Sequence, residues 1–404
     1  MSLRSIVPDK TSLPAKLFLM GTTFSGLGNG AINVVLQLYL LSLGFNSELI
    51  GSIILMSPIG TALLTIPAGI LADRYGKKKI VLFGFSIWWL WILILVSTPR
   101  SIEVFRLVFL LVGVSNATYS VWTPIYSSFF EKGDMDRAFG LLGFLNIISM
   151  SIGSLFGFIP SMLVANYGFP LQSAYWTVLI MGVGVSVLST PFLIVSLRGV
   201  VDPKREEGFT FTLKSKSVVA KFSLLTVIGS LGFGVFFSLF PYYANKKFGI
   251  ESDALGSLFF ISNLVSAGSN VLASRVSKRL GTLKAIVLAL SLHIPFYLMI
   301  PLASSFTWLS LLYITRLSVR QIAHPLETSL FMKLVQGEEK AMANSIRTMT
   351  MQGGGVVAPW LGGQIMGHVS LEAPAYIGAG LYTIHAASYY FLLRNDKEVQ
   401  TANS

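Results

Sequence analysis

The sequence of 404 residues contains no cysteine, and only 12% of its residues are charged. Without cysteine, neither a disulfide nor a thiolate metal site can form. The four histidines are scattered and do not have the spacing of a metal-binding motif. Soluble proteins carry about a quarter of their residues as Asp, Glu, Lys or Arg. This chain has too few charges to cover a globule of its size, so we expect lipid to cover much of its surface, with no metal and no cofactor.

Apolar sequence takes the place of the missing charge. Hydrophobic residues make up 53% of the chain, and its mean hydropathy is +0.69. A helix that crosses the hydrocarbon core needs about 20 apolar residues. Twelve stretches of about that length occur, at 14–43, 47–72, 79–97, 102–130, 138–165, 171–197, 217–246, 252–277, 284–303, 307–334, 342–368 and 374–393. The longest polar interruption is 198–216, so we predict two six-helix bundles, 1–197 and 217–404, joined by a cytoplasmic linker at 198–216.

The two halves of the chain repeat each other. Gly28 and Gly30 correspond to Gly232 and Gly234 within the same Leu-Gly-x-Gly pattern. Further corresponding positions are Gly44 and Gly249, Gly51 and Gly256, and Gly76 and Gly281. Because six spans are an even number, both halves keep the same orientation. We therefore predict an all-α membrane protein whose bundles are related by a pseudo-two-fold axis along the membrane normal.

Lysine and arginine predict the orientation in the membrane. Of the loop residues on the side opposite the termini, only Arg100, Lys246 and Lys247 are basic. This asymmetry places both termini in the cytoplasm of a multi-pass plasma (inner) membrane protein. It also accounts for the net charge of +12, because the basic side faces anionic lipid. Membrane lipid is therefore an expected partner, and nucleic acid is not.

A charged loop separates the second and third apolar stretches. It reads Gly69-Ile-Leu-Ala-Asp73-Arg74-Tyr-Gly76-Lys77-Lys78-Lys79, and a weaker copy stands at 274–284 with Lys278 in place of Asp73. Twelve spans in two like-oriented sets of six, with Gly-x3-Asp-Arg-x-Gly-Lys-Lys-Lys after the second, resemble the major facilitator superfamily of secondary transporters. The resemblance covers essentially the whole chain.

This resemblance implies a transporter that works by alternating access and is not an enzyme. No Walker A pattern and no convergent catalytic set occur in the sequence. In the family the loop steadies the outward-facing state, and Asp73 would accept hydrogen bonds at a helix end and pair with a base. The expected latch consists of Gly69, Asp73, Arg74, Gly76, Lys77, Lys78 and Lys79. The alternative is a solvated loop that only obeys the charge asymmetry.

A second pattern lies in the eleventh span. Gly354-x3-Ala358-Pro359-x2-Gly362-Gly363 resembles the Gly-Pro motif of the drug antiporters of the family, although theirs lies in the fifth span. Proline removes a helical hydrogen bond and glycine allows close approach. We therefore expect a helix bend formed by Gly354, Pro359, Gly362 and Gly363, with simple close packing as the alternative.

The tenth span carries four ionisable residues. Arg316, Arg320, His324 and Glu327 follow one another at spacings of four, four and three, which places them on one stripe of a helix. Ionisable groups at membrane depth usually face a cavity or a partner. The two arginines would attract an anion, and His324 and Glu327 are the candidates for proton coupling. The alternative is a structural ion pair of Glu327 with Arg320 or Arg347.

Spans 1, 4, 7 and 10 line the central cavity in this family. The resemblance therefore implies substrate contacts at Asn29, Asn33, Tyr119, Trp122, Tyr242, Tyr243 and Asn245, together with Arg316 and Arg320. The predicted function is proton-coupled export of an amphipathic small molecule by a monomer, with protons or another coupling ion as partner. One alternative is an organic-anion uniporter, symporter or exchanger that uses Arg316 and Arg320. A membrane receptor or lipid-handling protein on the same scaffold is another.

Overall fold

The structure is a computed structural model that describes residues 11–98, 100–131, 134–200, 215–335 and 340–394. Over these residues the chain is α-helical, with short 3-10 turns and without a strand. The helices follow one another as twelve long segments, some of which are split into two consecutive helices. The chain folds into two compact units. Unit 1 comprises Met1–Gly44, Ile59–Gly208 and Glu251–Asn263, and unit 2 comprises Phe45–Pro58, Phe209–Ile250 and Leu264–Ser404.

Two short segments, 45–58 and 251–263, are grouped with the unit built mainly from the other half of the chain. The predicted division into 1–197, 198–216 and 217–404 ignores this exchange and stays a prediction. Most of the predicted linker, residues 201–214, lies outside the described residues.

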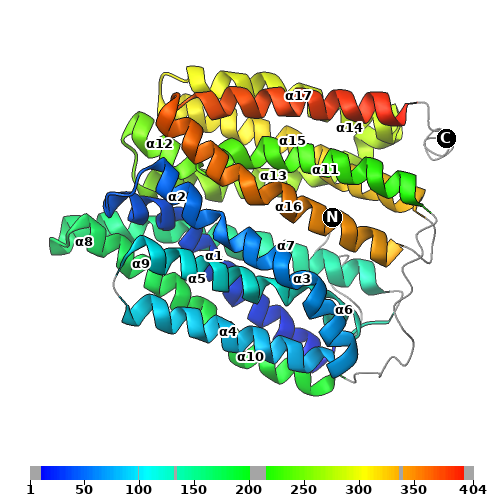
Figure 1. The fold of residues 1–404 in the computed structure, drawn as a ribbon, viewed down its shortest axis with the longest axis horizontal. Helices are drawn as coiled ribbons and strands as arrows, with labels where there is room; N and C mark the ends of the chain where they lie inside the picture. The colour runs from blue at the N-terminus through cyan, green and yellow to red at the C-terminus, as the bar shows by residue number, and fades with distance from the viewer. Residues whose placement is uncertain (1–10, 99, 132–133, 201–214, 336–339, 395–404) are drawn as a thin grey trace. The chain divides into compact units, whose positions relative to one another are not determined.

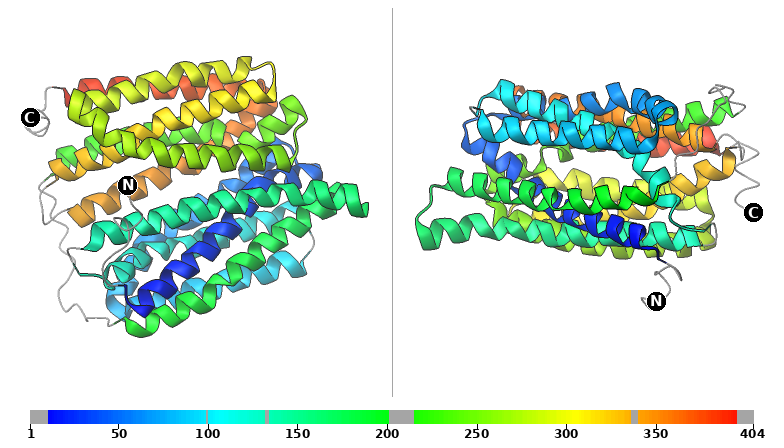
Figure 2. Two further views of the ribbon diagram at one scale, coloured as in Figure 1. Left: turned by 180° about the vertical axis from the view of Figure 1, so that it is seen from behind. Right: turned by 90° about the horizontal axis from the view of Figure 1, so that it is seen from below.

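Helix α1 (Leu13–Ser42) is the central helix of unit 1. It begins after Ser12, whose side chain accepts a hydrogen bond from the Ala15 amide and so caps the helix. It packs along α7 (Met135–Ser154), α9 (Leu171–Val187) and α10 (Ser189–Ser196), and Figure 2 shows it among these helices. The other elements of the unit are α3 (Met56–Tyr75), α4 (Lys77–Ser97), α5 (Ile102–Ala117), α6 (Tyr119–Ser127), η3 (Leu155–Gly157), α8 (Phe158–Tyr167) and η4 (Leu197–Gly199).

Small residues bring α1 close to its neighbours. A Cβ atom at Gly30 would meet the backbone oxygen of Met150 on α7. A Cβ atom at Gly153 on α7 would likewise meet the backbone of Leu27. Phe24 of α1 also stacks on Phe192 of α10, with ring centroids 5.5 Å apart. The glycines therefore set a close helix crossing, as is common where lipid supplies no hydrophobic driving force between helices.

A buried tyrosine links α6 to α7 in the core of unit 1. The hydroxyl of Tyr126 donates to the carbonyl oxygen of Ala138 at 2.9 Å, and its ring packs on Phe18. We expect Tyr126→Phe to cost about 1 kcal/mol, because the carbonyl of Ala138 then loses a buried donor. Thermal unfolding of the purified protein, followed by tryptophan fluorescence, measures the loss. Tyr390→Phe, at an exposed ring, is the control and should leave the transition unchanged.

Unit 2 is built around a second long helix, α11 (Lys216–Phe237). It packs along α16 (Lys340–His368) and α17 (Ala373–Leu393), while α14 (Thr282–Met299) packs along α15 (Phe306–Leu334) and α17 (Figure 1). The other elements are α2 (Ser47–Ile54), α12 (Phe240–Phe248), η5 (Ile300–Leu302) and the larger part of α13 (Ser252–Leu280).

Helix α16 runs without interruption through Pro359. A Cβ atom at Gly362 would meet the carbonyl oxygen of Val235 on α11, and one at Gly363 would meet that of Ser47 on α2. The Ser47 hydroxyl donates to the carbonyl oxygen of Gly363 at 3.0 Å. These contacts agree with the alternative that the glycines serve close helix packing. A functional bend at Gly354, Pro359, Gly362 and Gly363 stays a prediction.

Seven segments of the described chain are long and apolar enough, by length and composition alone, to cross a membrane. They are Leu13–Ser42, Ser47–Ala72, Lys77–Ser97, Arg137–Tyr167, Leu171–Ser196, Lys216–Phe248 and Thr282–Leu302. Helix α15 is not one of them, and it carries Arg316, Arg320 and Glu327. A helix with such residues needs a partner or a water-filled cavity for them.

Candidate functional site

Three charged residues of α15, namely Arg316, Arg320 and Glu327, lie inside unit 2. Arg316 is 1% exposed and Glu327 is 5% exposed. Nη2 of Arg320 donates to Oε2 of Glu327 at 3.1 Å. Arg347 instead donates to the hydroxyl of Thr328, at 3.2 Å from both of its terminal nitrogens. Of the two bases considered for Glu327, Arg320 is therefore the one that pairs with it.

Aromatic rings surround the guanidinium of Arg316. Its Cζ lies 3.8 Å from the ring centroid of Phe237 and 5.9 Å from that of Phe233, both on α11. It also lies 5.0 Å from the ring of Tyr297 and 5.5 Å from that of Tyr382. A cation beside several ring faces is stabilised by cation–π attraction. This attraction holds the charge but leaves Nε and Nη2 of Arg316 without acceptors.

Several polar atoms of this cluster are buried without a hydrogen-bond partner. They are Nε and Nη2 of Arg316, Nη1 of Arg320 and Oε1 of Glu327. Two arginines and one carboxylate also leave one positive charge in excess. A buried charge is normally paired or hydrogen-bonded. The unpaired donors and the excess positive charge could therefore both be satisfied by one more acidic group.

Two buried histidines join the cluster. His293 on α14 is 0% exposed, and its ring stands at a right angle to Tyr382, with centroids 4.4 Å apart. His385 on α17 is 2% exposed and interacts electrostatically with Glu327 and Arg320. Its ring occupies a slot left by Gly229 on α11, where a Cβ atom would lie 2.8 Å from Cε1. Each stands alone in its apolar stretch, so only helix packing brings His293 to Arg316 and Arg320, and His385 to Glu327.

The structure separates the predicted stripe into two environments. Arg316, Arg320 and Glu327 belong to the buried cluster, whereas His324 is exposed. The backbone oxygen of His324 accepts a hydrogen bond from the Thr328 hydroxyl at 3.3 Å. A role of His324 in proton coupling stays a prediction.

The predicted contacts in unit 1 also fall into two groups. Asn29, Asn33 and Tyr119 are exposed, and the Asn29 amide donates to the carbonyl oxygen of Ser25 at 2.9 Å. Trp122 is buried, and its ring lies 5.4 Å from that of Phe18. The first three residues are exposed, and Trp122 belongs to the core of unit 1.

The predicted contacts of α12 are mainly buried. Tyr242 and Tyr243 are 7% and 0% exposed. The Asn245 amide donates to the carbonyl oxygen of Ile250 at 2.7 Å, beyond the end of the helix. Lys247 lies over the ring of Tyr243 at 5.5 Å and pairs with Glu372 at 3.3 Å. Each of these contacts stabilises this end of unit 2.

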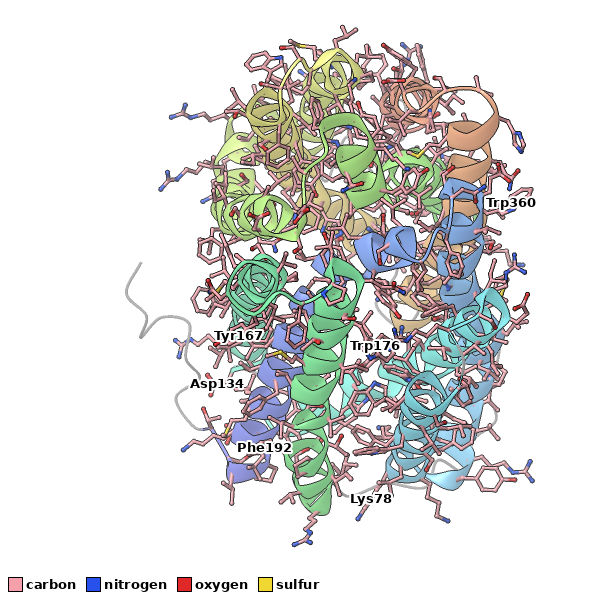
Figure 3. The ribbon with its side chains drawn as sticks, turned by 90° about the vertical axis from the view of Figure 1, so that its left-hand side faces the viewer. Lys78, Asp134, Tyr167, Trp176, Phe192 and Trp360 are labelled. Carbon is pink, nitrogen blue, oxygen red and sulfur yellow. The ribbon has the colours of Figure 1, made fainter. Side chains whose placement is uncertain are left out.

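The charged loop between α3 and α4 is a single glycine. Gly76 has φ 98°, a left-handed value that favours glycine. Gly281 between α13 and α14 has φ 82°, so the repeat extends to the backbone. Lys78 lies in the first turn of α4 and is exposed (Figure 3). The side chain of Asp73 lies outside the described residues, so its latch role stays a prediction.

The site contains residues that the sequence interpretation did not select. Phe233 and Phe237 follow directly from the repeat: Gly28 and Gly30 align with Gly232 and Gly234. In this register Phe233 stands where Asn29 stands, and Phe237 where Asn33 stands. The repeat was therefore a signal that could have identified both. No comparable signal marks His293 or His385.

Comparison with known proteins places the chain in a family. The family model of the Major Facilitator Superfamily matches residues 18–319 and 224–404. An uncharacterized transporter of Buchnera aphidicola subsp. Schizaphis graminum is 30% identical over 173 residues, 42% of each chain. An uncharacterized membrane protein of Saccharomyces cerevisiae is 34% identical over 113 residues, 27% of this chain and 25% of the relative. The matches thus span less than half the length of these relatives.

Solved structures show the same fold at low identity. A bacterial homologue of the human lysosomal transporter Spinster, inward-facing and occupied, has a TM-score of 0.72 at 14% identity and covers 95% of this chain and 97% of its own. The nucleoside transporter NupG has 0.71 at 14%, covering 95% and 100%. PepTSo of the POT family has 0.75 at 12%, covering 97% and 99%. The predicted all-α membrane fold is confirmed. The chain belongs to the Major Facilitator Superfamily.

Proposed function

We propose that this transporter couples the movement of an amphipathic organic solute to that of protons, through the Arg320–Glu327 pair. The observation that carries the proposal is Glu327, the one buried carboxylate among the described residues, which is paired to Arg320 and whose second oxygen has no hydrogen-bond partner. Export, a monomeric state, and cytoplasmic termini in the plasma membrane belong to the same proposal.

A proton on Glu327 changes what Arg320 must bind. While Glu327 is ionised, its charge offsets that of Arg320. Once Glu327 is protonated, the pair is lost and Arg320 needs another acceptor in a medium where an unpaired charge is costly. By linkage, a solute that satisfies Arg320 favours protonation of Glu327 and moves together with the proton, whereas export against an inward proton gradient requires a cationic solute that pairs with ionised Glu327 and is displaced when Glu327 is protonated. His385, His324 and Tyr389 are further titratable groups that interact with Glu327.

A second candidate is an organic-anion uniporter, symporter or exchanger. The observation that favours it is Arg316, whose Nε and Nη2 are buried without acceptors. Here the anion itself supplies the missing negative charge, and no proton is required.

The loop Gly69–Lys79 is proposed to act as a conformational latch through Asp73. Lys77, Lys78 and Lys79 lie in the first turn of α4, where basic residues are unfavourable next to the positive end of the helix dipole. The three lysines therefore have a role other than stabilising helix α4. Contact with anionic lipid and a part in the latch are two such roles.

Proton coupling is tested in proteoliposomes with an imposed pH gradient. Dansylglycine serves as an amphipathic anion probe and ethidium as an amphipathic cation probe. We expect flux of at least one probe to follow the gradient and to collapse when a protonophore is added. In Glu327→Gln the gradient dependence should disappear while exchange without a gradient persists. Flux that ignores the gradient in the unmodified protein would contradict the proposal, and so would an unchanged response in Glu327→Gln.

A further inference from the structure

The unpaired N–H groups of Arg316 form one edge of its guanidinium. Nε–H and Nη2–H point in the same direction, and both atoms are buried without an acceptor. This side-on edge matches the two oxygens of a carboxylate, which bind it through two parallel hydrogen bonds. The missing partner is therefore a pair of acceptor atoms, and no described side chain supplies it.

The charge of the cluster limits the partner to one negative charge. Arg320 and Glu327 neutralise each other at 3.1 Å, which leaves the charge of Arg316. A monoanion brings the cluster to neutrality. A doubly charged phosphate would replace an excess positive charge by an excess negative one, at a similar desolvation cost.

The aromatic rings determine what the carboxylate is attached to. Phe233 and Phe237 are stacked, with centroids 5.6 Å apart and an interplanar angle of 22°. Phe233 is 47% exposed and Phe237 is 7% exposed. The stack thus leads from the surface of unit 2 to the guanidinium, and an apolar body gains free energy by lying on it.

The sequence repeat supports a solute-facing role for this stack. Phe233 and Phe237 occupy the register positions of Asn29 and Asn33, which are exposed on α1. The same helix face therefore carries polar groups in one half of the chain and aromatic groups in the other.

We infer that Arg316, Phe233 and Phe237 form a binding site for an organic monocarboxylate. Its carboxylate meets Nε and Nη2 of Arg316, and its apolar body lies on the two phenylalanine rings. This inference names the solute class for the proposed transport function and rests on that function for its physiological meaning. Binding itself is an equilibrium property and needs no proton gradient.

The test uses three small probes of the same shape, namely benzoate, benzamide and benzylamine. Binding to the protein in lipid nanodiscs is measured by isothermal calorimetry, with empty nanodiscs as blank. In the unmodified protein, benzoate should bind at least about tenfold more tightly than the other two, because only it satisfies both donors. Equal binding of the three probes would overturn the inference without any variant.

Variants locate the site. Arg316→Gln should lower benzoate affinity by at least about tenfold. Arg316→Lys should lower it as well, since a point charge does not reproduce the two-bond edge. Phe233→Ala should weaken binding less. Arg347→Gln is the matched control, because this arginine lies in the same unit and donates to Thr328; its benzoate affinity should not change.

Two further outcomes decide the solute class and separate the inference from the proposed function. Phosphate that displaces benzoate at equal concentration would show a general anion site and overturn the monocarboxylate assignment. If benzoate binding depends on Arg316 but the fluxes do not respond to the pH gradient, proton coupling is wrong and the carboxylate site stands. If flux is proton-coupled but benzoate binding does not depend on Arg316, this inference is wrong and proton coupling stands.

Discussion

Replacing Glu327 by leucine is expected to destabilise the protein by about 3–5 kcal/mol, the usual cost of removing one partner from a buried ion pair. Arg320 keeps its charge and loses the carboxylate that lies 3.1 Å from it. The carboxylate of Glu327 is almost inaccessible to solvent, so water cannot replace it. Unfolding in mixed micelles with increasing dodecyl sulfate, followed by tryptophan fluorescence, measures the change.

The double variant Arg320→Met, Glu327→Leu distinguishes a lost pair from lost packing. If the cost comes from an unpaired charge, removing both charges should restore most of the stability, because apolar replacements of a buried pair are often neutral. Strictly additive losses would contradict this account. Glu131→Gln, at an exposed carboxylate, is the surface control and should have little effect.

Most of the helical architecture was predictable because it depends on local sequence. The lengths of the apolar stretches gave the helical segments. A short loop between two apolar stretches was predicted from charge and glycine, and the structure shortens it to Gly76 because α3 continues to Tyr75 and α4 begins at Lys77. Local signals of this kind need no knowledge of which helices are neighbours.

The composition of the site was less predictable because it depends on neighbours. The sequence identified Arg316, Arg320 and Glu327, because ionisable residues inside a membrane span cost free energy. It did not identify the neighbouring residues of this cluster, which lie on α11, α14 and α17. His385 reaches Glu327 only because Gly229 leaves space for its ring. A single sequence does not state which glycine faces which histidine.

Aromatic residues posed a related difficulty. Trp122 and Tyr243 lie on helices expected to line a cavity, but both are buried in the cores of their units. Phe233 stands on such a helix and is exposed. Residue type does not separate these cases, because an aromatic ring suits both a core and a solute site. The register of the repeat does separate them, since it places Phe233 on the face of α11 that corresponds to the exposed face of α1 defined by Asn29 and Asn33.

The second large effect is expected at Gly153, where α7 crosses α1. A Cβ atom at this position would meet the oxygen, carbonyl carbon and Cα of Leu27. Overpacked cores usually lose about 1–3 kcal/mol. Gly153→Leu should lose more, because the opposing atoms are backbone and cannot move aside as a side chain does. The fraction of protein that remains monodisperse in gel filtration measures the effect.

Gly143 provides the control on the same helix. No described atom lies within 4 Å of a Cβ placed there, and leucine is a better helix former than glycine by about 0.8–1 kcal/mol. Gly143→Leu should therefore fold at least as well as the unmodified protein. The two variants add the same side chain to the same helix and differ only in what that side chain meets. Equal folding of both would mean that α1 and α7 can separate without loss, and the tight crossing that holds α1 at the centre of unit 1 would not be what stabilises the unit.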